Sequence, residues 1–96
     1  MEKKMTMELR KKYTLVDVLV LASLLRYGNE HLPTGGFLRA VLENDLRSAV
    51  ARADDYNMAT LRDIVTFIYS ELPRDCWGSP ERVSAWLGET TQKEIK

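Results

Sequence analysis

Apolar residues recur every three or four positions in the second half of the chain, and this spacing predicts α-helices. The clearest stripe consists of Leu61, Ile64, Val65, Ile68 and Leu72. On a helix these positions share one face, which can be buried against the rest of the protein. Pro73 follows directly and ends the helix, because proline cannot continue the backbone hydrogen-bond ladder.

A second helix is expected to begin after Thr34 and to run to residue 53. Its apolar face consists of Leu38, Val41, Leu42, Leu46, Ala49, Val50 and Ala53. Arg39, Glu43 and Arg47 fall four residues apart on the opposite face, which is typical of a solvated, salt-bridged stripe. Asn44 and Asp45 interrupt this helix, and the chain could bend there because both side chains compete for backbone groups.

Two more helices are indicated by the residues at their ends. Thr14 is expected to cap the first helix and Gly28 to end it, since glycine adopts the left-handed conformation of a helix stop. Ser79 followed by Pro80 is a strong start signal for the last helix, and Gly88 is its predicted stop.

Four helices joined by short loops predict an all-α fold, a compact bundle of about four short helices. Residues 1–12 hold five basic and two acidic residues and are predicted to form a flexible basic arm, with an edge strand or a helix extension as alternatives. Residues 13–88 would form a single helical domain, and residues 89–96 a frayed tail.

The first helix is apolar nearly all round, which favours a place in the core or at an interface with another copy of the chain. We therefore expect a homo-oligomer through this helix. Its apolar run, residues 15–25, is far shorter than the roughly 20 residues that cross a bilayer. No small-residue cleavage site follows it, so neither a membrane anchor nor a signal peptide is expected, and we predict a cytoplasmic protein.

The charge balance argues against a protein that coats nucleic acid or an anionic membrane. Fourteen basic residues balance fourteen acidic ones, whereas those tasks need a summed positive field. One cysteine and one histidine cannot build a structural zinc site. No nucleophile–base pair or metal set is evident, so we expect neither an enzyme nor a cofactor. Cys76 is expected to be a structural residue.

The most promising candidate for a ligand site is the predicted start of the second helix. Gly35 and Gly36 would leave backbone N–H groups uncovered, and the helix dipole favours an anion at that point. Thr34 is the expected cap there, and His31 and Arg39 are candidate charge partners for a nucleotide-like anion. The alternative is a tight turn in which the two glycines let Phe37 pack into the core.

Trp77 and Trp86 are candidates for a partner-binding surface, since tryptophan is enriched at recognition sites. The alternative is that both fill the core of a small bundle. The two helices between residues 61 and 87 also suggest a helix-turn-helix regulator that binds nucleic acid. Against it, the connection is long and the region offers only Arg74 and Arg82 as basic contacts.

Several strings of this chain resemble a group of small proteins encoded by bacteriophages and prophages. The strings are Gly35-Gly36-Phe37-Leu38, Ala40-Val41-Leu42, Asn44-Asp45-Leu46, Arg52-Ala53-Asp54 and Cys76-Trp77-Gly78-Ser79-Pro80-Glu81, together with Asn57 and Trp86. The resemblance covers roughly residues 32–86 and carries over no catalytic residue. It implies a phage accessory gene expressed in the bacterial cytoplasm.

Together, these observations predict a non-enzymatic phage accessory protein that binds either a host protein or a small anionic ligand. The nucleic-acid-binding regulator is the alternative.

Overall fold

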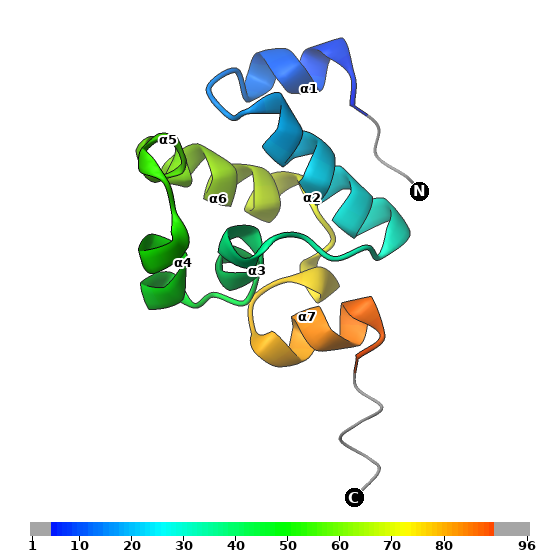
Figure 1. Cartoon of the computed structure of the whole chain (residues 1–96). Helices are drawn as coiled ribbons and strands as arrows, with labels where there is room; N and C mark the ends of the chain where they lie inside the picture. The colour runs from blue at the N-terminus through cyan, green and yellow to red at the C-terminus, as the bar shows by residue number, and fades with distance from the viewer. Residues whose placement is uncertain (1–4, 90–96) are drawn as a thin grey trace, which may run out of the picture.

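The computed structural model describes residues 5–89. Seven α-helices and one short 3-10 turn, joined by loops, form this part of the chain (Figure 1). No β-strand occurs in this range. The elements are α1 (Met7–Lys12), α2 (Val18–Glu30), α3 (Gly36–Leu42), α4 (Leu46–Arg52), α5 (Asp55–Ala59), α6 (Leu61–Glu71), the turn Arg74–Cys76 and α7 (Pro80–Leu87). The predicted all-α class is confirmed, but the number of helices exceeds the predicted four.

The extra helices arise where expected helices break. Asn44 adopts a left-handed conformation with φ of 64°, and the carboxylate of Asp45 then accepts a hydrogen bond from the Ser48 N–H, 3.2 Å away. The expected bend is therefore a full break between α3 and α4, and Arg47 lies on a different helix from Arg39 and Glu43. Asp54 caps a separate short helix, α5.

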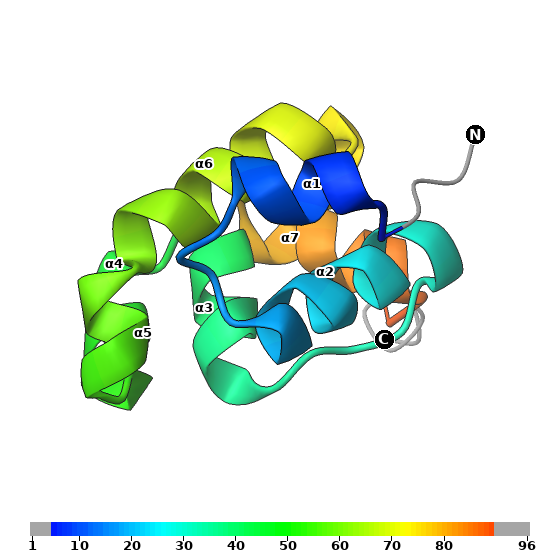
Figure 2. The same cartoon turned by 90° about the horizontal axis from the view of Figure 1, so that it is seen from above.

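Residues 7–12 form a helix in place of the flexible arm predicted there. Thr6 caps it, and Leu9 is buried in the core. The end of α1 is tied to α6, because the Tyr13 hydroxyl donates to Glu71 over 2.8 Å. Viewed from above, α1 projects between α6 and α2 (Figure 2). Residues 1–4 lie outside the described residues, as does the predicted frayed tail except for Glu89.

Both predicted ends of the first long helix are wrong. Asp17 caps α2 in place of Thr14, and its carboxylate accepts from the Leu19 N–H at 2.7 Å. The helix runs through Gly28 to Glu30, and His31 takes the left-handed stop position. Gly28 serves a different purpose, since a Cβ atom there would lie only 2.9 Å from Leu72 Cδ2. The missing side chain lets α2 approach the segment after α6.

The core draws side chains from nearly every part of the chain. Its fully buried members are Leu21, Leu24, Tyr27, Leu42, Ile64, Phe67, Cys76 and Val83. The predicted stripes are only partly buried, because the break at Asn44 turns Leu46 outward, where it is 68% exposed. Val50 and Val65 are also exposed. In Figure 1, α1 and the start of α2 lie at the opposite end of the molecule from α7.

Candidate functional site

The start of α3 does not have the capped geometry that the sequence predicts. Gly35 is the cap residue and offers no side chain, while the Thr34 hydroxyl donates to the Gly35 carbonyl oxygen, 3.0 Å away. Thr34 therefore does not cap the first N–H groups of α3. The helix has only seven residues, so its dipole is short.

A polar hollow of about 210 Å³ does lie beside this helix. It is lined by Gly36, Arg39, Ala40, Glu43, Asp45, Ser48 and Arg52. Two of the predicted ligand residues, Gly36 and Arg39, line it, whereas His31, Thr34 and Gly35 do not. Arg52 was not expected here; its Nη1 lies 2.9 Å from the position of a Cβ atom at Gly36.

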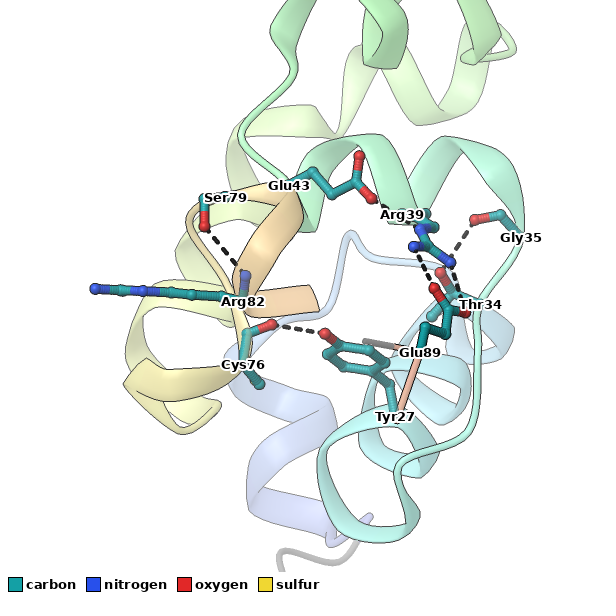
Figure 3. Close-up of polar contacts among 9 residues, drawn as sticks. All are labelled: Tyr27, Thr34, Gly35, Arg39, Glu43, Cys76, Ser79, Arg82 and Glu89. Atoms are coloured by element: carbon teal, nitrogen blue, oxygen red, sulfur yellow. Dashed lines mark hydrogen bonds and ion pairs between the residues drawn. The ribbon is translucent and has the colours of Figure 1, made fainter. Parts of the chain in front are cut away.

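Arg39 is already held by two carboxylates (Figure 3). Its Nε donates to Glu43 over 2.8 Å, and its two terminal nitrogens donate to Glu89 over 3.1 and 2.8 Å. These hydrogen bonds raise the pKa of the Arg39 guanidinium, and the Arg39 side chain lowers the pKa of Glu89. The positive charge of Arg39 is thus compensated within the chain, which weakens it as a partner for an external anion.

His31 is turned toward α7. Its Nδ1 lies 2.8 Å from the Trp86 carbonyl oxygen, so the proton on this nitrogen is assigned by that contact. The imidazole also stacks on the Trp86 indole, with ring centroids 4.1 Å apart. The indole N–H in turn donates to the Tyr27 carbonyl over 2.7 Å. Trp86 is half-buried and joins the two helix ends, as the core alternative for the tryptophans predicts.

Tyr27 extends this connection to the loop before α7. Its hydroxyl is fully buried and donates to the Cys76 carbonyl over 2.6 Å (Figure 3). Burial raises the pKa of the Tyr27 hydroxyl and raises the pKa of the Cys76 thiol to about 12. Such a thiol stays protonated at neutral pH and is a poor nucleophile.

Trp77 is also half-buried, and its neighbours are Tyr69 at the end of α6 and Arg74 in the turn that follows. Its ring contacts Tyr69 with centroids 5.6 Å apart, and the Arg74 guanidinium lies 5.1 Å from the ring. Arg82, on α7, folds back so that its Nη1 donates to the carbonyl oxygens of Arg74 and Trp77. The two basic residues expected to contact nucleic acid are thus both engaged around Trp77.

A larger hollow, which sequence reasoning missed, lies at the other end of the molecule. It measures about 600 Å³ and is lined by Met7, Arg10, Lys11, Tyr13, Thr14, Val16, Asp17, Val18, Leu21 and Tyr56. We call it the α1–α2 groove. The Tyr56 hydroxyl donates to the Leu15 carbonyl and so joins α5 to this end. The sequence held two signals, the basic residues among positions 1–12 and the apolar surplus of residues 15–25, but neither predicted a groove.

Two apolar residues that line this groove, Met7 and Val18, are exposed, at 70% and 43%. Leu15 and Leu19 adjoin lining residues in the sequence without lining the groove themselves, and they are 62% and 74% exposed. Among residues 5–89, neither Arg10 nor Lys11 makes an ion pair. Within the described part of the chain, the groove thus combines exposed apolar side chains with two basic side chains and one carboxylate, that of Asp17.

Other classes of site are not apparent in the described part of the chain. Residues 5–89 contain no group of three or more histidine, cysteine or acidic side chains that could hold a metal ion. No helix among them is both long and apolar enough to cross a membrane. Protein-family models, curated proteins and solved structures gave no match to this chain, and the resemblance to phage proteins stays a prediction.

Proposed function

We propose that this is a non-enzymatic binding protein whose partner is another protein, held at the α1–α2 groove. The observation that carries the proposal is the exposure of two apolar side chains that line the groove, Met7 and Val18, with exposed Leu15 and Leu19 at the same end of the fold. Exposed apolar side chains that are grouped in this way and flanked by polar residues are unfavourable in water and mark interaction sites.

The small anionic ligand is the less favoured version of the same prediction. The hollow beside α3 contains Glu43 and Asp45 as well as Arg39 and Arg52, and Arg39 is bound by two carboxylates. An anion entering this hollow would meet repulsion as well as attraction. The α1–α2 groove, by contrast, is lined by one carboxylate, that of Asp17, which already accepts a backbone hydrogen bond.

The setting we propose, a phage accessory protein acting on a host protein in the bacterial cytoplasm, is supported by the sequence resemblance alone. A nucleic-acid-binding role finds no comparable support, since α7 carries Arg82 as its one basic residue and that side chain bonds its own loop.

Two exposed apolar residues provide a matched test of the proposed function. Met7 lines the groove and is the first residue of α1, whereas Leu46 is the first residue of α4 and lies outside the groove. Both are mostly exposed, at 70% and 68%. The tagged protein is used to capture partners from bacterial lysate, which are identified by mass spectrometry. We expect one stoichiometric protein with the unchanged chain and with Leu46→Asp, and its loss with Met7→Asp.

Thermal unfolding of both variants controls for folding, since exposed substitutions change stability by only about 0.5 kcal/mol. Equal capture by Met7→Asp would contradict the proposed site, and an empty eluate from the unchanged chain would contradict a host-protein partner.

A further inference from the structure

We propose that the α1–α2 groove binds a short amphipathic helix of the partner, with apolar side chains against Met7 and Val18 and carboxylates against Arg10 and Lys11. This inference rests on the proposed function and specifies the chemistry of the partner.

The floor and walls of the groove suit apolar side chains. Val16 and Leu21 are buried beneath it, while Met7 and Val18 remain exposed at its sides. Methionine is unbranched and polarisable, so Met7 can adapt to the shape of an incoming side chain. Burying these side chains against a partner removes apolar surface from water, which is the main favourable contribution to association.

The charge of the groove indicates an acidic partner. Met7, Arg10 and Lys11 are spaced three and four residues apart, so they share one face of α1 and all line the groove. The next basic residue, Lys12, is already paired with Glu71 over 3.2 Å. Arg10 and Lys11 make no such pair within residues 5–89. Complementary charge fixes the orientation of a partner and speeds its association.

The expected conformation of the partner segment follows from the secondary structure around the groove. An extended peptide binds by adding a strand to an exposed sheet edge, and residues 5–89 contain no strand. A groove between two helices instead accepts the apolar face of a third helix. The partner segment is therefore expected to be helical, with leucine-like and acidic residues at helical spacing.

A second copy of this chain fits the groove less well. A two-fold dimer brings the same patch of both subunits together. Each patch carries two basic side chains, Arg10 and Lys11, against one carboxylate, Asp17, so two copies of it meet with a shared excess of positive charge and repel. The homo-oligomer predicted from the first helix is therefore the competing occupant, and the test must distinguish it.

Two fluorescein-labelled peptides test the inference by fluorescence anisotropy at low salt. Both have leucines at helical spacing; one carries glutamates between them and the other lysines. We expect the unchanged protein to bind the glutamate peptide at least tenfold more tightly than the lysine peptide. The double variant Arg10→Glu/Lys11→Glu should reverse this preference, because the groove then repels the first peptide and attracts the second.

Two further variants control for the total charge of the protein and for its folding. Arg47→Glu/Arg62→Glu makes the same change of charge at exposed positions outside the groove and should leave the preference unchanged. The milder double variant Arg10→Gln/Lys11→Gln should abolish the preference without reversing it. It replaces Arg10→Glu/Lys11→Glu as the test if that variant fails to fold. Far-ultraviolet circular dichroism confirms that each variant keeps its helices.

Equal binding of both peptides, failure of the glutamate peptide to bind, or an unchanged preference after charge reversal would overturn the inference. The proposed function would survive these outcomes if Met7→Asp still lost the captured protein. Sedimentation equilibrium tests the competing occupant: a dimer that Met7→Asp converts to a monomer would also overturn the inference, with a second copy in the groove.

Discussion

At its carboxyl end α2 is held by a series of contacts, whereas at its amino end it borders an open groove. The Tyr27 hydroxyl donates to Cys76, the Trp86 indole donates to Tyr27, and His31 bonds and stacks on Trp86. We call this the closed end. At the other end, Met7 and Val18 are exposed in the α1–α2 groove together with two basic side chains that make no ion pair in residues 5–89.

The difference shows that residue type alone does not assign a role in this protein. A histidine, a tryptophan and an arginine looked like ligand or partner residues, and each is engaged within the chain. The leucines of the apolar runs were expected in the core, but Leu15, Leu19 and Leu46 are exposed to solvent. The useful distinction is whether a side chain has its partner inside the chain.

Substitutions at the two ends of α2 should differ most in their effect on stability. Tyr27→Ala removes a fully buried ring and is expected to lower the free energy of unfolding by about 3–5 kcal/mol, as for other large aromatic residues. Val18→Asp, at the amino end of α2 in the groove, should change it by only about 0.5 kcal/mol. Urea denaturation measures both, and similar losses would show that the groove also holds the fold together.

Tyr27→Phe separates the hydroxyl from the ring. It leaves the Cys76 carbonyl without its donor, and we expect a loss of about 1–3 kcal/mol. A variant as stable as the unchanged chain would mean that this hydrogen bond contributes little to the closed end.

The reactivity of Cys76 tests how tightly the closed end excludes water. Burial raises the pKa of this thiol to about 12, so iodoacetamide at pH 8 should react at least a hundredfold more slowly than with free cysteine. Complete labelling in guanidinium chloride is the control. Rapid labelling of the folded protein would show that the closed end opens.

How far the sequence predicts the fold depends on how local the deciding contact is. The start of α7 at Ser79 and Pro80 and its stop at Gly88 were predicted, since capping involves neighbours within four residues. The Arg39–Glu43 pair was predicted for the same reason. Gly28 was misread as a stop, because its partner, Leu72, is distant in sequence.

The candidate site was less predictable than the fold. The groove exists because α1 packs over α2 and α6, which depends on the Tyr13–Glu71 hydrogen bond across 58 positions. The basic character of residues 1–12 was evident from the sequence, as was the apolar surplus of the first long helix. Their meeting in one groove follows from tertiary packing, which helical spacing does not specify.

Gly88 offers a smaller test of the closed end, because it positions Glu89 beside Arg39. Its φ is 75°, in the left-handed region that penalises residues with a Cβ atom. Gly88→Ala should therefore lower stability by about 1–2 kcal/mol, measured by urea denaturation. Gly36→Ala is the matched control, since its Cβ would meet only the flexible end of Arg52. Equal losses in the two variants would contradict a special role for the left-handed conformation at Gly88.

The smallest expected effect comes from Glu89. Arg39 lowers the pKa of its carboxyl, so the stabilising contribution is present above the unfolded pKa, near 4.3, and is lost as the pH falls through the folded value. Glu89→Gln should slightly lower the Tm at pH 7 and match the unchanged chain at about pH 3. The same substitution at exposed Glu30 is the control; a difference that persists in acid would argue against the ion pair.

The hydrogen bonds at the closed end also determine when a nascent chain can complete its fold during synthesis. Tyr27 bonds Cys76 and Trp86, which are 49 and 59 positions farther along. During synthesis from the amino end, α2 exists long before those partners are made, and Tyr27 stays without them. A ribosome paused before residue 76 would therefore leave Tyr27 incompletely covered, and exposed apolar segments of this kind are the ones that chaperones bind.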